Sequence, residues 1–472
     1  MKDNRRDFLK FTGLAGLGFA TGTVKGFANE TEKDSVSAQY EKFDDQQFNM
    51  SGYAAPKINT VRVGFIGLGQ RGPTHLKNMT KMDGVSIMAL CDIREEKVLE
   101  AKKLIQDLGQ NATTYSGGKD EWRKLCDRKD IDLIFIATPW AMHVPMAVYA
   151  MEQGKHVAIE VPASKTIDEC WQLVKTSERT RKHCMMLENC CYDFFELMTL
   201  NMARQGFFGD IIHTEGAYIH YLLDLNFKKD GYWDMWRLKE NIGRNGNLYP
   251  THGLGPVCQV MNINRGDKMD YLVSMSSIDN MMGPEAKELA AKDDFYKPYV
   301  NKPYRGNMNT TVIRTNKGST IMIQHDVTTP NVYSRIHKIS GTKGSALKYP
   351  LPGRIATGHE EWLSEDEMKS LETKFQPAIV KKVGEMAKQV GGHGGMDFLM
   401  DWRLIDCLRN GLPLDQDVYD AALWSSIAPL SESSVADRSK SVDVPDFTRG
   451  AWKQNKPVDI SLKEGGNTTV KI

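Results

Sequence analysis

The feature that most constrains the fold is an apolar run that ends in three spaced glycines. Residues 61–72, VRVGFIGLGQRG, have the pattern of a buried strand followed by Gly67, Gly69 and Gly72 in the spacing G-x-G-x-x-G. Such glycines permit a tight turn, let the backbone approach a pyrophosphate and allow the next helix to pack closely. The N-terminus of that helix offers free N–H groups to the phosphates. The pattern predicts a Rossmann dinucleotide-binding turn.

Asp92 supports this interpretation, because it ends the second predicted strand twenty residues after Gly72. A carboxylate at that place accepts hydrogen bonds from the ribose hydroxyls of NAD and repels the 2′-phosphate of NADP. We therefore expect NAD as the cofactor, while the nearby Arg94 leaves NADP as an alternative. A glycine turn with a purely structural role is the other interpretation.

The order of strands and helices predicts two domains of an α/β protein. Alternation over residues 60–188 is typical of a Rossmann domain with a parallel sheet covered on both faces. Residues 189–472 contain longer, more closely spaced β-rich runs and predict an α+β domain with a large, mostly antiparallel open-faced sheet. The predicted strands are 61–69, 85–92, 131–139, 156–162, 182–190, 210–221, 269–278, 308–329 and 334–349, and the predicted helices are 71–82, 93–109, 140–154, 166–180, 365–375, 394–411 and 417–437.

Charge and cysteine usage exclude several classes of protein. The chain of 472 residues has 61 basic and 60 acidic side chains and a net charge of +1, which gives no basic footprint for nucleic acid or an anionic membrane.

Eight cysteines are present, Cys190 and Cys191 are adjacent, and no C-x-x-C spacing occurs. Neither a zinc site nor a redox pair is indicated, so we expect buried free thiols and no metal.

The first 28 residues have the pattern of a targeting segment. Arg5 and Arg6 precede Phe-Leu-Lys and a Gly-rich apolar stretch that is too short for a convincing membrane span. This predicts a twin-arginine signal peptide, with cleavage near Ala28, and hence a periplasmic protein without a membrane span after processing. A disordered basic tail is the alternative. Residues 29–59 are polar and predict a linker or surface arm.

Several motifs in order resemble the glucose–fructose oxidoreductase and inositol dehydrogenase superfamily: VGFIGLGQRG, ALCDIREEK, DLIFIATPWAMH, GKHVAIEVPASKT and LENCCYD. In those dehydrogenases a Glu-Lys-Pro triplet supplies a lysine for sugar oxidation, but here the triplet is Glu160-Val161-Pro162. Trp140 replaces the common Asn after the third strand. With these departures, and with YPTHGLGPV at 249–257 and GGHGGMDFLMDWRLIDCLRNG at 391–411, the chain resembles glycoside hydrolase family 109, the NAD-dependent α-N-acetylgalactosaminidases.

The resemblance implies two sets of binding residues. Four of these residues also have a purely structural interpretation. Trp140 can be a core tryptophan and His143 a helix cap. Tyr333 can be an ordinary surface aromatic residue, and the segment around Arg237 can be a cluster that fills the core. His393 and Asp397 have a site role or an N-terminal capping role. The cofactor set is Gly67, Gly69, Gln70, Arg71, Gly72, Asp92, Trp140 to His143, Glu160, Val161 and Asn189, and the sugar set is Tyr218, Arg237, Tyr249, Pro250, Thr251, His252 and Tyr333.

Tyr249 and His252 are the predicted catalytic pair, because they lie three residues apart near an expected helix start and project to one face. The implied retaining reaction is transient oxidation of C3 by tightly bound, recycled NAD+, deprotonation of C2 by one of the two residues, elimination of the aglycone and addition of water. A sugar dehydrogenase of the same superfamily and a non-catalytic sugar-binding protein are the alternatives. The open-faced sheet permits a homo-oligomer.

Overall fold

The computed structural model describes residue 46 and residues 48–471, which form one compact unit. The predicted signal peptide at 1–28 and most of the predicted arm lie outside the described residues. The described end of the arm packs on the C-terminal part of the chain. Gln46 Nε2 and the backbone N–H of Met50 donate to the hydroxyl of Tyr419, over 2.8 and 3.1 Å, and Met50 is buried.

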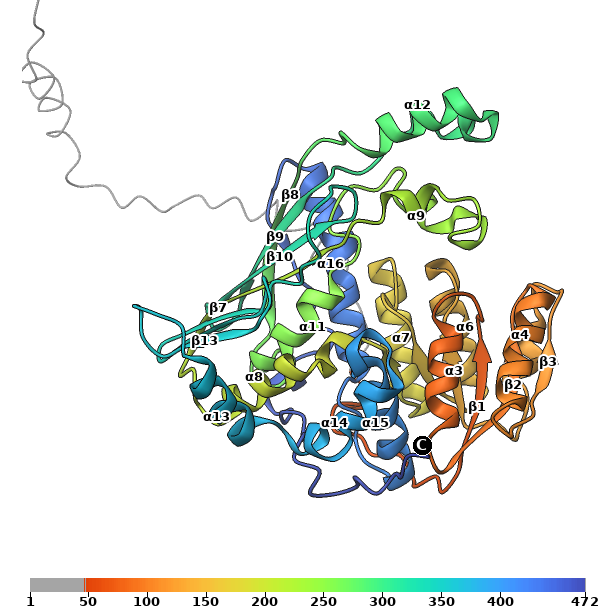
Figure 1. Cartoon of the computed structure of the whole chain (residues 1–472), viewed down its shortest axis with the longest axis horizontal. Helices are drawn as coiled ribbons and strands as arrows, with labels where there is room; N and C mark the ends of the chain where they lie inside the picture. The colour runs from red at the N-terminus through yellow and green to blue at the C-terminus, as the bar shows by residue number, and fades with distance from the viewer. Residues whose placement is uncertain (1–45, 47, 472) are drawn as a thin grey trace, which may run out of the picture. The chain divides into compact units, whose positions relative to one another are not determined.

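The first sheet has the predicted parallel Rossmann arrangement, with strand order β3-β2-β1-β4-β5-β6 and every pair parallel (Figure 1). The order reverses between β1 and β4, which is where ligands bind in such sheets. The strands are β1 (Val61–Ile66), β2 (Val85–Cys91), β3 (Thr113–Tyr115), β4 (Leu133–Ile136), β5 (His156–Ile159) and β6 (Cys184–Met186). The helices between them are α3 (Gly72–Thr80), α4 (Glu95–Gln106), α5 (Glu121–Cys126), α6 (His143–Glu152) and α7 (Ile167–Thr180).

Two long C-terminal helices return to this layer. Helix α15 (Met396–Asn410) packs on α3 and β1, and α16 (Val418–Ala436) packs on α7 and β6 and also on the second sheet. Figure 1 shows α15 beside α3, although some 300 residues separate them in the chain. The C-terminal part therefore supplies side chains to the Rossmann domain as well as to its own sheet.

The second sheet has the order β13-β12-β11-β7-β10-β9-β8-β14 and is mostly antiparallel, as predicted, with β7 and β10 as a parallel pair. Gly318 adopts φ +95° in the predicted hairpin turn between β9 and β10. The strands are β7 (Ile211–Ile219), β8 (Met269–Ser276), β9 (Asn309–Thr315), β10 (Thr320–Asp326), β11 (Lys338–Gly341), β12 (Ser345–Leu347), β13 (Arg354–Ala356) and β14 (Val442–Asp443).

Helix α11 (Thr251–Val260) lies directly on β7, and two facing glycines make this contact possible. A Cβ on Gly216 would meet the carbonyl oxygen of Gly253 at 2.4 Å, and a Cβ on Gly253 would meet the backbone nitrogen of Ala217 at 2.2 Å. Because both clashes involve backbone atoms, any larger residue would push the helix away from the strand. This close approach sets the first turn of α11 against the middle of the sheet.

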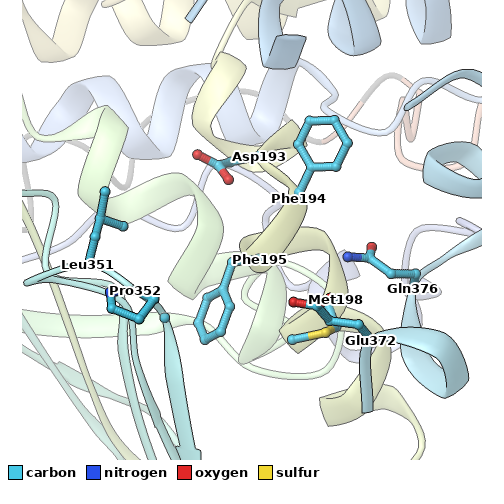
Figure 2. Close-up of a pocket in the computed structure, with 9 residues that line it drawn as sticks. Asp193, Phe194, Phe195, Met198, Leu351, Pro352, Glu372 and Gln376 are labelled. Carbon is cyan, nitrogen blue, oxygen red and sulfur yellow. The ribbon is translucent and has the colours of Figure 1, made fainter. Parts of the chain in front are cut away.

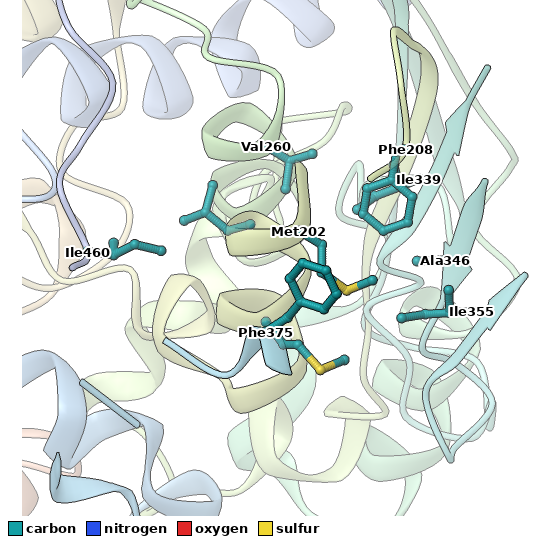
Figure 3. Close-up of a cluster of buried hydrophobic side chains, with 10 residues drawn as sticks. Met202, Phe208, Val260, Ile339, Ala346, Ile355, Phe375 and Ile460 are labelled. Atoms are coloured by element: carbon teal, nitrogen blue, oxygen red, sulfur yellow. The ribbon is translucent and has the colours of Figure 1, made fainter. Parts of the chain in front are cut away.

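A hydrophobic cluster packs against strands β11, β12 and β13 at one edge of the second sheet (Figure 3). Side chains of α8 (Phe194–Arg204), including Met202, pack between Val260 of α11 and Ile339 of β11. Phe375, at the end of α13 (Glu365–Phe375), closes the cluster. The cluster fixes α8 and α13 against the sheet, and these helices border the second site described below.

Several elements were not predicted or differ from the prediction. Strand β6 ends at Met186, where the prediction extended to residue 190, because the chain turns into a 3-10 helix at Asn189–Tyr192. Helix α13 has its predicted bounds, and α15 and α16 start and end within two residues of theirs. The additional helices are α5, α8, α9 (Leu223–Phe227), α10 (Trp236–Glu240), α12 (Met282–Lys292) and α14 (Ala378–Val390).

The structure describes all eight cysteines, and each is buried and unpaired, as expected for free thiols. No helix within the described residues combines the length and the apolar character that a bilayer crossing requires.

Candidate active site

The glycine turn after β1 has the features that a bound pyrophosphate needs. Gly67 adopts φ +92°, and a Cβ there would meet the carbonyl oxygen of Ala137 at 2.5 Å. A Cβ on Gly72 would meet the carbonyl oxygen of Gly67 at 2.1 Å, whereas one on Gly69 would meet only Arg94, at 3.5 Å. The first turn of α3 has no side-chain cap and no acidic residue, so no side chain of its own competes with an anion for this helix end.

Asp92 lies at the carboxyl end of β2 and closes the turn. Its Oδ2 accepts from the backbone N–H of Leu68 at 2.8 Å, and its Oδ1 accepts from the backbone N–H of Arg94 at 3.0 Å. The side chain of Arg94 also donates to Oδ1, at 3.3 Å. Asp92 is therefore fixed beside the glycines, and the other lone pairs of its carboxylate can accept from ribose hydroxyls.

A buried ionic network joins the turn to the end of β5 and to α15. Arg71 Nε lies 2.9 Å from Oε1 of Glu160, and its Nη1 lies 3.1 Å from Oδ2 of Asp397. His75 Nε2 lies 3.0 Å from the same oxygen of Glu160, and its Nδ1 lies 2.8 Å from Oδ2 of Asp401. Burial alone raises the pKa of Glu160, but Arg71 and His75 hold it far below its ordinary value. Glu160 is therefore an ionised carboxylate.

Three other predicted residues meet at this network. Asn189 Nδ2 donates to Oδ1 of Asp397 at 2.6 Å, and His393 Nδ1 lies 2.8 Å from the other oxygen of Asp397. Asp397 is thus an ionic partner rather than a helix cap. Val161 is buried next to Glu160 and offers no proton-transfer group. Gln70 in the glycine turn is exposed, and its side-chain amide donates to the carbonyl of Gly231 at 2.6 Å.

Trp140 and His143 follow β4 but have different surroundings. Trp140 stacks on Tyr249, with ring centroids 5.7 Å apart and an interplanar angle of 22°. His143 has no exposed surface, and its two ring nitrogens lie 2.8 Å from the carbonyl oxygens of Pro162 and Thr138. Trp140 therefore belongs to the wall of the site, whereas His143 ties together the loops after β4 and β5 from behind.

The predicted sugar-binding residues form one aromatic and cationic cluster. The rings of Tyr218, Tyr249 and His252 lie 4.8–5.1 Å from one another. The guanidinium of Arg237 lies 4.9 Å from the ring of Tyr249 and donates to the hydroxyl of Tyr232 at 3.0 Å. Flat rings beside a guanidinium suit a sugar, which presents an apolar face and ring hydroxyls.

Burial controls protonation in this cluster. It raises the pKa of Tyr218 to about 12, and it raises the pKa of Tyr249 well above its ordinary value, although Arg237 opposes both shifts. Burial alone lowers the pKa of Arg237, but the phenols of Tyr232, Tyr218 and Tyr249 raise it above its ordinary value. At neutral pH both tyrosines are therefore hydrogen-bond donors and Arg237 is a cation.

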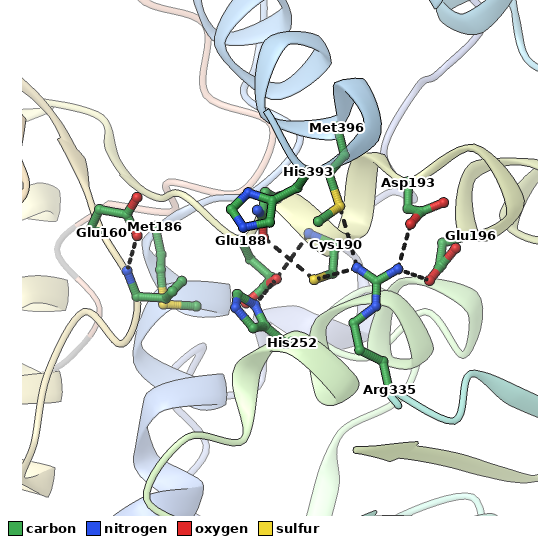
Figure 4. Close-up of polar contacts among 12 residues, drawn as sticks. Glu160, Met186, Glu188, Cys190, Asp193, Glu196, His252, Arg335, His393 and Met396 are labelled. Atoms are coloured by element: carbon green, nitrogen blue, oxygen red, sulfur yellow. Dashed lines mark hydrogen bonds and ion pairs between the residues drawn. The ribbon is translucent and has the colours of Figure 1, made fainter. Parts of the chain in front are cut away.

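His252 is paired with a carboxylate that the sequence interpretation missed (Figure 4). Its Nδ1 lies 2.7 Å from Oε1 of Glu188, which is fully buried. Burial alone raises the pKa of Glu188, but the charge and hydrogen bond of His252 lower it below its ordinary value. With Nδ1 donating to this carboxylate, Nε2 is the nitrogen free to take a proton.

The remaining predicted residues differ in exposure. Tyr249 lies two residues before α11, which begins at Thr251, so the helix starts close to its predicted position, and the rings of Tyr249 and His252 are in contact, with centroids 5.0 Å apart. Pro250 and Thr251 are buried at the helix start. Tyr333 is 38% exposed and contacts His220 with ring centroids 5.0 Å apart, at the edge of the cluster.

Among the described residues, Glu188, Cys190 and His252 form the one group whose ligand atoms lie close enough, within 4.8 Å, to hold a metal ion. Burial raises the pKa of Cys190 well above its ordinary value, so the sulfur is a thiol in the protein without an ion. The guanidinium of Arg335 lies 2.8 Å from that sulfur and adds a positive charge. The arrangement suits proton transfer better than metal binding.

Comparison with known families decides the assignment. Residues 192–454 match the model described as Glycosyl hydrolase 109, C-terminal domain, and residues 61–188 match the Oxidoreductase family, NAD-binding Rossmann fold. The chain belongs to glycosyl hydrolase family 109. This family 109 chain is a glycosidase with an NAD-binding domain, so the altered Glu160-Val161-Pro162 triplet occurs in a hydrolase.

Individual proteins agree with the family 109 assignment. Glycosyl hydrolase family 109 protein 1 of Bacteroides fragilis is 50% identical over 427 residues, which cover 87% of this chain and 90% of that protein. A second B. fragilis protein, named alpha-N-acetylgalactosaminidase, is 50% identical over 413 residues, covering 86% and 96%. Levoglucosan dehydrogenase in complex with NADH is 18% identical, with a TM-score of 0.61 over 82% of this chain and 100% of that chain, and shows the shared fold.

The turn of this family 109 chain fits NAD. The backbone clashes at Gly67 and Gly72 explain why both positions lack side chains, and the open space at Gly69 leaves room for a phosphate. Glu188 was the important omission from the sequence interpretation. Its motif, LENCC, was recognised, but a glutamate near the end of a predicted strand has no pattern of its own that indicates a histidine partner 64 residues away.

Proposed function

We propose that this protein releases terminal α-linked N-acetylgalactosamine and that tightly bound NAD is recycled within each turnover. The B. fragilis relative named alpha-N-acetylgalactosaminidase supports the choice of sugar. The observation that supports the chemistry is the His252–Glu188 pair, which lies in one cluster with Tyr218, Tyr249 and Arg237. An ordinary glycosidase places two carboxylates across the scissile bond, and NAD-dependent enzymes are exceptions to that rule.

When bound, NAD+ would supply an acceptor that takes the hydride from C3 of the sugar and returns it to C3 at the end of the turnover, and the ketone at C3 makes the hydrogen on C2 acidic in between. We assign the C2 base to Nε2 of His252, because Glu188 holds Nδ1 and stabilises the positive charge that the ring acquires. Loss of the C2 proton expels the aglycone from C1, and water then adds at C1 as His252 returns the proton. The net reaction is hydrolysis, with no consumption of cofactor.

Tyr249 has a different role in this proposal. Its raised pKa keeps the hydroxyl protonated, so it donates a hydrogen bond and does not act as the resting base. Its ring contacts both Trp140 and Arg237, which also contact each other, and these contacts fix the direction of the hydroxyl. We assign Tyr249 to the hydroxyl or carbonyl oxygen on C3, where a donor stabilises negative charge that develops during deprotonation of C2.

A sugar dehydrogenase that exchanges NAD with solution is the competing function, and Val161 disfavours it because a valine cannot transfer a proton. The test uses purified protein and p-nitrophenyl α-N-acetylgalactosaminide without added NAD, in D2O. We expect release of p-nitrophenolate, no accumulating NADH absorbance and deuterium at C2 of the released sugar. NADH formed from free sugar would establish the dehydrogenase. Tight sugar binding without either reaction would establish a binding protein.

We propose further that the protein is exported through the twin-arginine route to the periplasm. Arg5 and Arg6 before an apolar stretch support this assignment. Recycling of NAD removes the need for a cofactor supply outside the cytoplasm, which is compatible with export of a folded, loaded protein. Replacing both arginines by lysine should leave the protein in the cytoplasmic fraction, and unchanged periplasmic recovery would contradict the proposal.

A further inference from the structure

A second pocket of about 540 Å³ lies beside the proposed active site (Figure 2). It is bounded by the start of α8, the end of α13 and the loop between β12 and β13. Leu351 and Pro352 form one side, Glu372 and Gln376 the other, and Phe195 lies between them. This volume is within the range of sites that bind small organic molecules.

The pocket is connected to the His252 site by two sets of contacts. Arg335 lies 2.8 Å from the sulfur of Cys190 and 2.5 Å from Oδ2 of Asp193, and Asp193 lines the pocket (Figure 4). On the surface, the ring of Tyr333 lies 6.0 Å from that of Tyr349, two residues before Leu351 in the pocket wall. Tyr333, which also contacts His220, and Tyr349 therefore form an aromatic line from the edge of the His252 cluster toward the pocket wall.

The lining combines apolar surface with acceptors for hydroxyl groups. Phe195 and Leu351 offer apolar contacts, and Leu351 is 66% exposed. Asp193 is ionised, because Arg335 and Lys348 outweigh the effect of burial and hold its pKa far below the ordinary value. Glu372 adds an exposed carboxylate. Carboxylates accept from sugar hydroxyls. Because Arg335 and Lys348 neutralise Asp193, it is the charge of Glu372 that disfavours an acidic sugar such as one with a carboxylate of its own.

Gln376 adds a polar group to the lining. It lines the pocket, and Figure 2 shows its side-chain nitrogen on the side that faces Phe194. An amide N–H donates to a sugar hydroxyl, whereas the nearby carboxylate of Glu372 accepts from one. The lining therefore offers a donor as well as acceptors.

We propose that this pocket is a distal subsite that binds an uncharged sugar of the aglycone, so that the enzyme acts on oligosaccharides that end in the cleaved sugar. The proposal rests on the proposed function. It assigns Phe195, Leu351, Glu372 and Gln376 to recognition of the aglycone and leaves the reacting sugar to the cluster around His252. A glycopeptide is the competing occupant, and the experiment separates the two.

The test compares kcat and KM for three substrates with the same terminal α-N-acetylgalactosamine: the p-nitrophenyl glycoside, a neutral oligosaccharide and a threonine glycopeptide. The double variant Leu351→Ala/Glu372→Ala changes two exposed side chains, so the fold should persist. We expect its KM for the oligosaccharide to rise about tenfold, with the aryl glycoside and the glycopeptide within about twofold. Lys369→Ala, on exposed surface of the same helix and outside the pocket lining, is the matched control and should change none of them.

An unchanged oligosaccharide KM in the double variant would overturn the proposal, as would an effect on the glycopeptide alone. Direct binding separates this failure from failure of the proposed function. The oligosaccharide without its terminal N-acetylgalactosamine is titrated calorimetrically into the holoenzyme and the double variant. Binding that the double variant loses supports the subsite even if no glycoside is hydrolysed, and absent or equal binding overturns it.

Discussion

His252 Nδ1 lies 2.7 Å from Oε1 of Glu188, a carboxylate with no exposed surface that comes from the chain just after β6. The side-chain amide of Gln416 donates to the backbone carbonyl of Glu188 at 2.9 Å and fixes that segment. A buried carboxylate beside a histidine selects the tautomer with a free Nε2 and stabilises the ring after it accepts a proton. The pair therefore determines which atom of His252 can act as a base.

Glu188→Gln tests this relationship. The amide keeps the size of the side chain but removes its charge, and it can present N–H to His252, which favours the wrong tautomer. We expect kcat for the p-nitrophenyl glycoside to fall roughly 10²- to 10³-fold, with bound NAD retained. Steady-state kinetics and the absorbance of extracted cofactor measure both. Activity within a few-fold of wild type would remove Glu188 from the mechanism.

Tyr249→Phe tests the proposed donor near C3. The variant keeps the ring that stacks on Trp140 at 5.7 Å and loses only the hydroxyl. We expect kcat to fall about tenfold to a hundredfold with a small change in KM, because the hydroxyl acts when negative charge develops. Tyr232→Phe, which removes the hydroxyl that accepts from Arg237, is the matched control and should have a smaller effect on kcat. Equal effects of the two variants would contradict the assignment.

Alanine substitutions at Gly72 and Gly69 of the turn are expected to have different effects on stability. Gly72→Ala places a methyl group 2.1 Å from a backbone oxygen, so both thermal stability and NAD binding should fall. Gly69→Ala meets only a flexible arginine at 3.5 Å, so its melting temperature should stay near the wild-type value while NAD affinity drops about tenfold or more. Thermal melts and NAD titration of the apoprotein measure both. Wild-type NAD affinity in Gly69→Ala would show that the phosphate lies elsewhere.

Most of the Rossmann layer could be predicted from local patterns. The buried strands and amphipathic helices have strong periodicity, and Thr166 with Glu169 forms the capping box that starts α7. Strand β3 was missed because Thr113–Tyr115 is short and mostly exposed. Strand β6 was predicted too long, because the chain after Met186 leaves the ladder with β5 and enters a 3-10 helix at Asn189–Tyr192. Periodicity does not indicate where hydrogen bonding to a neighbouring strand stops.

The site could be predicted only where motifs indicate it. Tyr218, Arg237, Tyr249 and His252 were predicted and lie together. The ionic network was predicted in part, because His75 and Asp401 are ordinary residues of amphipathic helices whose contact depends on the packing of α15 against α3. Glu188 was missed for the same reason. Long-range pairing of polar residues depends on tertiary packing, which no short segment of sequence specifies.

The network around His75 predicts the pH dependence of stability. Burial alone lowers the pKa of His75, but the charge and hydrogen bond of Asp401 and the hydrogen bond of Glu160 raise it to about 9. A histidine whose folded pKa exceeds its unfolded value of about 6.5 binds its proton more tightly in the folded state. Its contribution is therefore complete below pH 6.5 and is lost as the pH rises toward 9.

His75→Gln should reveal that contribution as a difference from wild type. Over pH 6.5 to 9 the free energy of unfolding of the wild type should fall by an amount on the order of 3 kcal/mol more than that of the variant. Chemical denaturation at half-unit pH steps measures both curves, and the NAD-free protein is used so that cofactor binding does not contribute. His359→Gln, at an exposed histidine, is the control and should follow the wild-type curve. Parallel curves for wild type and His75→Gln would show that His75 is neutral in the folded protein.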